Sequence, residues 1–230
     1  MAFITIKRKT VAVILALILA VVAVAATAAS VIASARAENG VTIVIDPGHG
    51  GADGGVVGVS TGTKESDVNL SISKYLADYF KKSGYTVVLT RTDMGSVEGG
   101  IKYSKRGDMA ARRNVVEKAS PDLVISVHCN SFPRSSVSGA QVFYAQSATL
   151  GKQFADTVQG YFNEVLNKKP RSAAVGDYYI LNCTEYPSIL CECGFLSNFD
   201  DEKNLITASY QEKVAYTIFS AVNSVFYDKA

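Results

Sequence analysis

Two histidines stand at positions where a metal ion could be bound. His49 and His128 are the only histidines of the chain, and each lies at the end of an apolar run typical of a buried strand. The carboxyl ends of parallel strands meet at one edge of a sheet, which is where open α/β folds bind ligands. If the two strands are neighbours, both imidazoles could bind one zinc ion. Either histidine alone would more simply be a hydrogen-bonded structural residue.

A third ligand is expected from Glu65. Catalytic zinc sites use three protein ligands and leave a position open for water. Glu65 begins the segment KESDVN at 64–69, where the loop after His49 would return the chain to the same sheet edge. Taken alone, it could be an acid of the first helical turn that complements the helix dipole. Together with His128, these residues predict one catalytic Zn²⁺ bound by His49, Glu65 and His128.

Glu192 is the candidate catalytic residue. It lies within SILCECGF at 188–195, an otherwise apolar strand, where a carboxylate is costly to bury unless it is paired or protonated. Beside a zinc ion it could act as a general base, taking a proton from a water that the metal has made more acidic. A buried salt bridge with an arginine is the alternative. Strand alternation places Glu192 on the face of Leu190, with Cys191 and Cys193 on the opposite face.

The four cysteines are expected to be buried structural residues. Disulfides are common in small exported domains, but a domain of this size does not need them. The single residue between Cys191 and Cys193 is too short a spacing for a structural zinc site. A thiol hydrolase built on Cys129 would need a histidine as its base, and both histidines are already assigned to the metal.

The elements that must position these residues alternate along the chain. Strands are predicted over 41–46, 85–90, 122–128, 141–145, 178–181 and 188–193, and helices over 66–82, 104–119, 149–166 and 210–226. Strand and helix in alternation imply right-handed crossovers between parallel strands. We therefore expect a single α/β domain, with a mostly parallel central sheet of about six strands and helices on both faces.

The N-terminal segment predicts export. Residues 10–35 carry no charged side chain and follow the basic triplet 7–9, and ASA at 33–35 fits a signal-peptidase site. The uncharged run is also long enough to cross a bilayer, so membrane attachment through 10–35 is the alternative. We expect a signal peptide or membrane anchor with a short linker over 1–38 and a zinc-dependent catalytic domain over 39–230. The basic flank favours a domain outside the cytoplasm, secreted or membrane-anchored.

The composition excludes some classes of partner. A formal net charge of +2 is too small to indicate nucleic-acid binding. A hydrophobic fraction of 48% with 19% charged residues describes a chain that can bury one globular core.

Five segments, over about 41–227, resemble the zinc N-acetylmuramoyl-L-alanine amidases of the Amidase_3 type. They are IDPGHGGADG at 45–54, KE at 64–65, VLTR at 88–91, DLVISVHCNS at 122–131 and ECGFLSN at 192–198. The resemblance implies that His49, Glu65 and His128 bind zinc and that Glu192 is catalytic. The substrate would be peptidoglycan, cut between the lactyl group of N-acetylmuramic acid and L-alanine. Arg91 and Asn130 also match, and we interpret them as positioning residues or as purely structural ones.

Within the family, three short segments look most like the germination-specific amidases of spore formers. They are YSKR at 103–106, SGAQ at 138–141 and FLSN at 195–198. This similarity implies action on spore cortex in the forespore intermembrane space, followed by a muramic-acid deacetylase that completes muramic-δ-lactam. An accessory envelope protein could be needed to hold the metal. Another zinc hydrolase of wall glycan, such as a deacetylase, and an inactive wall-binding module are the alternatives.

Overall fold

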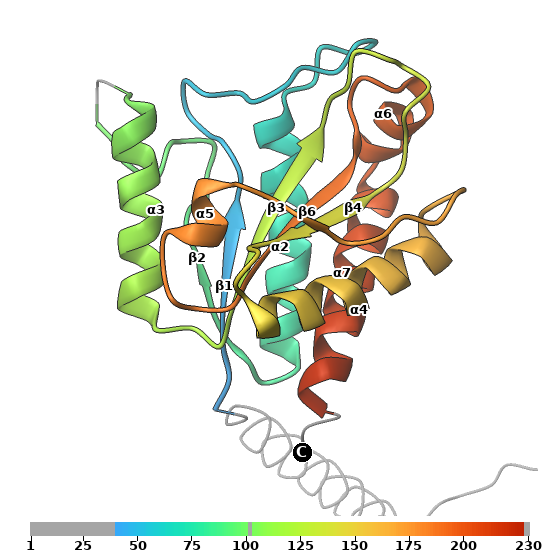
Figure 1. The fold of residues 1–230 in the computed structure, drawn as a ribbon. Coiled ribbons are helices and arrows are strands. Elements are labelled where there is room, and N and C mark those ends of the chain that lie inside the picture. The colour runs from blue at the N-terminus through green and yellow to red at the C-terminus, as the bar shows by residue number, and fades with distance from the viewer. Residues whose placement is uncertain (1–39, 101–102, 228–230) are drawn as a thin grey trace, which may run out of the picture. The chain divides into compact units, whose positions relative to one another are not determined.

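Six strands form one central sheet in the computed structural model of the protein (Figure 1). They are β1 (Thr42–Pro47), β2 (Thr86–Leu89), β3 (Leu123–Asn130), β4 (Gln141–Tyr144), β5 (Ala174–Val175) and β6 (Ser188–Phe195). Their order is β2-β1-β3-β6-β4-β5, and every pair is parallel except β4 with β6. The prediction of a mostly parallel sheet is confirmed. His49 lies two residues after β1 and His128 lies near the end of β3, and these two strands are neighbours.

The structure describes residues 40–100 and 103–227. From Gly40 onward the described residues belong to one compact unit. The leader or anchor predicted over 1–38 lies outside them. Among the described residues, no helix combines the length and apolar character that crossing a membrane requires.

Helices cover both faces of the sheet. They are α2 (Glu65–Lys82), α3 (Lys105–Ala119), α4 (Thr149–Val165), α5 (Tyr179–Asn182), α6 (Phe199–Leu205) and α7 (Ala208–Tyr227). Side chains of α2, α4 and α7 share the main hydrophobic core with one face of the strands, whereas α3 and α5 pack over the other face. The strands β1, β3 and β6 are therefore apolar on both sides, as strands covered on both faces must be.

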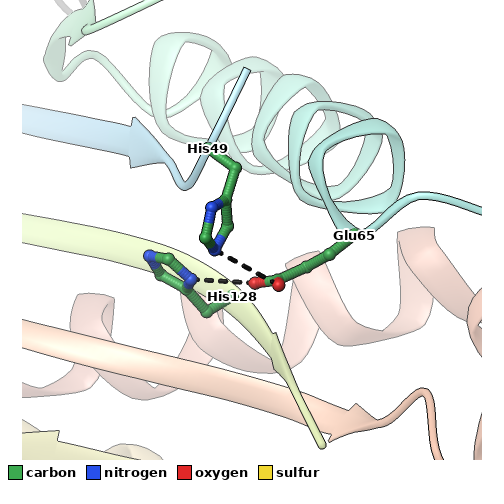
Figure 2. Close-up of side chains that lie close together, drawn as sticks. All are labelled: His49, Glu65 and His128. Atoms are coloured by element: carbon green, nitrogen blue, oxygen red, sulfur yellow. Dashed lines mark hydrogen bonds and ion pairs between the residues drawn. The ribbon is translucent and has the colours of Figure 1, made fainter. Parts of the chain in front are cut away.

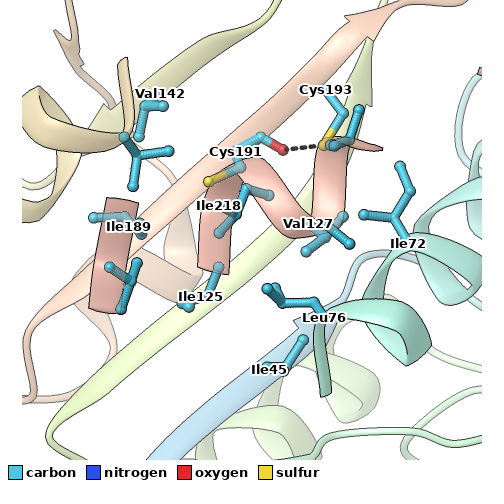
Figure 3. Close-up of a cluster of buried hydrophobic side chains, with 14 of the residues drawn as sticks. Ile45, Ile72, Leu76, Ile125, Val127, Val142, Ile189, Cys191, Cys193 and Ile218 are labelled. Carbon is cyan, nitrogen blue, oxygen red and sulfur yellow. Dashed lines mark hydrogen bonds between the residues drawn. The ribbon is translucent and has the colours of Figure 1, made fainter. Parts of the chain in front are cut away.

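The alternation of β6 puts its cysteines into the main core. Figure 3 shows Ile189, Cys191 and Cys193 in the same apolar cluster as side chains of α2 and α7. Leu190 packs on the other face with Ile180 of α5. All four cysteines are free thiols, as expected, but only Cys129, Cys191 and Cys193 are buried, whereas Cys183 is half-buried.

The prediction of a strand over 178–181 is wrong. These residues overlap the short helix α5, because Tyr178 is extended but the chain coils immediately after it. Ile180 and Leu181 bury their side chains against Leu190, and a run of four such residues fits a buried helical turn as well as a strand. The sequence analysis also did not predict β5 and α6. The two residues of β5 and the seven mostly polar residues of α6 are too few to show a clear apolar periodicity.

Candidate metal centre

Glu65 joins the two histidines. Its carboxylate is buried, with 2% of the residue exposed, and lies at the first residue of α2. One oxygen, Oε1, lies 2.9 Å from Nδ1 of His128, and the other, Oε2, lies 3.2 Å from Nε2 of His49 (Figure 2). The backbone amides of Cys129 and Val56 donate to the same two oxygens at 3.1 and 2.9 Å. The carboxylate is therefore fixed from both sides.

The three side chains singled out in the sequence could hold a metal ion. One ligand atom from each of His49, Glu65 and His128 can be chosen so that all lie within 4.8 Å of one another. The two imidazole rings lie 5.0 Å apart between centroids, at an angle of 77° between their planes. Two imidazoles and one carboxylate are a donor set that suits a catalytic zinc ion.

The turn after β1 has an unusual backbone that aims His49 at Glu65. His49 adopts a φ of 60°, the left-handed region that few residues other than glycine occupy. Gly48 just before it is required by space, since a Cβ atom there would lie 2.3 Å from the ring of His128. The two imidazoles can approach because the backbone between them carries no side chain.

Two buried arginines hold this turn in place. Arg112 donates to the carbonyls of Pro47 and His49 at 2.9 and 2.6 Å. Arg91 donates to the carbonyls of Pro47 and Gly48 at 3.0 and 2.9 Å. Every carbonyl oxygen of the turn from Pro47 to His49 thus accepts a hydrogen bond from a guanidinium. Arg91 was expected to have a positioning or structural role, and its contacts fit the first of these.

Arg112 was not found from the sequence. Its guanidinium is almost fully buried and forms ion pairs with Asp46 at 2.6 Å and with Asp108 at 2.8 Å. Burial opposes the charge of Asp46, but Arg112 and hydrogen bonds from Thr90 and Ser126 lower the pKa of that carboxyl. The only sequence signal is an acid and an arginine four residues apart on a helix. That spacing is common on solvated faces, so it does not indicate a buried pair.

Asp53 orients the ring of His49, and the sequence analysis gave it no role. Its Oδ2 lies 2.9 Å from Nδ1 of His49, which turns Nε2 toward Glu65. Tyr103 donates a hydrogen bond to the same Asp53 oxygen at 3.1 Å. Burial lowers the pKa of His49, but the carboxylates of Glu65 and Asp53 outweigh it and raise the pKa to about 9. A carboxylate behind a histidine ligand fixes its tautomer and orientation.

Glu192 lies beside these three residues, on the neighbouring strand. It is paired in register with His128 across β3 and β6, is only 7% exposed, and its Oε2 has no hydrogen-bond partner. The ion pairs of the described residues do not include Glu192, so the alternative of a salt bridge with an arginine is not met. Burial raises the pKa of Glu192 to about 7, since the opposing effect of His128 is smaller and Glu65 adds to the rise.

The cysteines near the site are not poised for chemistry. The side chain of Cys129 lies in the main core, and burial raises its pKa well above the ordinary thiol value. Burial does the same for Cys191 and Cys193. Neutral, buried thiols are poor nucleophiles, so the thiol-hydrolase alternative finds no support.

A cleft of about 1120 Å³ opens from the candidate metal ligands to the surface. Glu192, His49 and His128 lie among its lining residues, and its outer walls come from α3 and from the segment around α5. A substrate much longer than the reacting bond could therefore lie in it.

Comparison with known proteins decides the family. Residues 43–224 match the Amidase_3 family of N-acetylmuramoyl-L-alanine amidases. The chain belongs to this family. It is an amidase that hydrolyses peptidoglycan, as the germination-specific N-acetylmuramoyl-L-alanine amidase of Bacillus subtilis (strain 168) also indicates. That relative is 34% identical over 197 residues, which cover 83% of this chain and 82% of the relative.

Solved structures agree with this assignment. The CwlD amidase from Clostridioides difficile, solved in complex with the GerS lipoprotein, superposes with a TM-score of 0.75 at 32% identity, covering 80% of this chain and 96% of that one. The catalytic domain of CwlV from Bacillus (Paenibacillus) polymyxa gives a TM-score of 0.71 at 29% identity, covering 81% and 98%. Because the family's substrate is cell wall, the amidase acts outside the cytoplasm.

Replacing Arg112 with methionine should strongly destabilise the amidase. The change leaves Asp46 and Asp108 buried without a cation, and breaking a buried ion pair from one side costs about 3–5 kcal/mol. The neighbouring Arg113→Met is the matched control, because Arg113 pairs with Glu117 at the surface and its loss should cost far less stability. Urea unfolding measures the stability of both variants. Equal losses of stability would contradict the role of Arg112 in the buried ion pairs.

Glu192→Gln should stabilise the metal-free amidase at high pH. Since the pKa of Glu192 is raised from 4.5 to about 7, the folded protein binds this proton more tightly than the unfolded chain does. Stability is therefore lost as the pH rises from about 4.5 to about 7, by up to about 3 kcal/mol. Glutamine does not titrate, so the stability of the variant relative to the wild type should increase over this pH interval. Urea unfolding of chelator-treated protein between pH 4 and pH 8 tests this, and a constant difference would show the idea to be wrong.

Proposed function

We propose that the amidase is a zinc enzyme in which His49, Glu65 and His128 bind the ion and Glu192 transfers protons. The observation that carries the proposal is the convergence of two imidazoles on one buried carboxylate, with ligand atoms within 4.8 Å of one another. The unpartnered Oε2 of buried Glu192 is the second support, because a carboxylate oxygen left without a donor there needs a role. Both observations fit a catalytic zinc site.

The environments of the two glutamates explain why Glu65 is assigned to metal binding and Glu192 to proton transfer. Burial raises the pKa of Glu65, but hydrogen bonds with His128 and His49 lower it well below the ordinary range, so Glu65 stays anionic. A zinc ion bound there would polarise the lactyl carbonyl and increase the acidity of water. Glu192, which is buried and has one oxygen without a hydrogen-bond partner, takes the proton of the attacking water and returns it to the departing L-alanine nitrogen.

The biological setting is the finer part of the proposal. The similarity to a germination-specific amidase supports action on spore cortex, where the product would pass to a muramic-acid deacetylase. The CwlD structure contains the GerS lipoprotein, which supports an accessory envelope protein for this amidase as well. Residues 1–38, as signal peptide or anchor, would deliver the domain to the envelope.

His128→Ala should remove the metal. The variant takes one of two imidazoles from the donor set, and the remaining His49 and Glu65 should not retain zinc through extensive dialysis. Metal analysis of the purified protein after zinc loading measures the loss. Full occupancy in the variant would contradict this ligand set.

Glu192→Gln should keep the metal and lose turnover. The side chain is assigned to proton transfer, a role that contributes about 10²- to 10⁴-fold to rate, so kcat should fall at least about 100-fold. Zinc content should stay at the wild-type level, and a variant that loses its zinc would show that Glu192 is a ligand instead. Mass spectrometry of digested cortex or wall identifies the reaction, since an amidase frees L-alanine amino groups whereas a deacetylase frees acetate.

A further inference from the structure

Charged side chains of both signs line the cleft. Lys105 and Arg106, in the first turn of α3, line it together with Asp177, just before α5. All three side chains belong to exposed residues. They lie in the same cleft as His49 and Glu192, so a substrate that fills this cleft comes close to them.

These charges are not used within the part of the chain that the structure describes. Neither the two cations nor Asp177 forms an ion pair or side-chain hydrogen bond with another described residue. The other charged groups near this end of α3 are occupied: Glu98 accepts from the Ser104 amide, and Asp108 pairs with Arg112. Solvent-exposed charges of both signs along a reaction cleft are therefore free to bind charged groups of a substrate.

Helix geometry gives the spacing along α3 between the basic pair and Arg112 at the base of the site. Arg112 contacts the His49 carbonyl at the base of the site, and Lys105 precedes it by seven positions on α3. At about 1.5 Å per residue, that is roughly 10 Å along the helix. Two or three residues of extended peptide span about 7 to 11 Å. A cation at Lys105 or Arg106 is therefore placed for the second or third residue of a peptide held at the site.

The stem peptide has matching charges at that distance. In peptidoglycan, L-alanine is followed by a D-glutamate linked through its side chain, which leaves its α-carboxylate free, and then by a diamino acid with an ammonium group. Resting on the proposed function, we propose that Lys105 and Arg106 bind the free carboxylate of the second stem residue while Asp177 binds the ammonium of the third. Two binding groups of opposite charge thereby set which stems are accepted and in which direction they lie.

The carboxylate arm is tested with two soluble muramoyl peptides, one with D-glutamate and one with D-isoglutamine at the second position. For the full-length wild type, kcat/KM should be roughly tenfold higher on the glutamate substrate, mainly through KM, since each exposed charge pair contributes modestly. In the double variant Lys105→Gln/Arg106→Gln this preference should vanish, mainly because KM rises on the glutamate substrate, while zinc content is kept. Lys118→Gln, at the far end of α3, is the matched control and should retain the preference.

The proposed contact of Asp177 with the ammonium group is tested with two further muramoyl peptides. In one the side-chain amine of the third residue is free, and in the other it is acetylated. Asp177→Asn should abolish the preference for the free amine, whereas Asp78→Asn, an exposed acid on α2, should not. Equal cleavage of charged and neutral stems by the wild type, or a preference that survives both cleft variants, overturns the assignment. Failure of the wild type to release any stem from either substrate would instead overturn the proposed function itself.

Discussion

The carboxylate of Glu65 is the constraint on which the site depends. One side chain in the first turn of α2 faces both imidazoles and accepts hydrogen bonds from two backbone amides, so it joins segments far apart in the chain. Burying a charge is costly, and here each oxygen is given more than one donor. Asn69, one helical turn further along α2, donates to the same carboxylate at 3.2 Å, so α2 stabilises its own first residue. The position of the helix therefore fixes the position of the carboxylate that the two imidazoles face.

The turn that carries His49 is held by buried charge more than by apolar packing. The left-handed backbone of His49 and the turn's carbonyl groups without backbone partners would be unstable alone. Arg91 and Arg112 donate hydrogen bonds to those carbonyls. Arg112 is in turn neutralised by Asp46 and Asp108. Buried ionic groups of this kind contribute little net stability compared with apolar packing, but they allow few alternative arrangements. We infer that this cluster serves the position of the turn.

Glu65 and Glu192 show how environment gives two glutamates different chemistry. Both are buried at the end of the same sheet, yet the pKa of Glu65 is lowered by its donors while that of Glu192 is raised to about 7 by burial. Two carboxyls with separated pKa values suit one permanent anion and one proton carrier. Glu192, the proton carrier, lies in register with His128 on the adjacent strand. The strand pairing itself therefore places Glu192 at the site.

The sequence alone determined the fold class and singled out His49, Glu65, His128 and Glu192, because both depend on local pattern. Apolar runs ending in His49 and His128 specify strands whose ends meet at one edge, and an acid inside an apolar strand indicates Glu192. Tertiary structure decided the rest: which arginine is buried, which acid lies behind His49, and whether 178–181 coils or extends. Arg112 and Arg113 are adjacent and chemically identical, yet one is buried in an ionic cluster and the other lies at the surface. Only the packing of α3 against β1 distinguishes them, because burial depends on contacts between distant segments that no local pattern encodes.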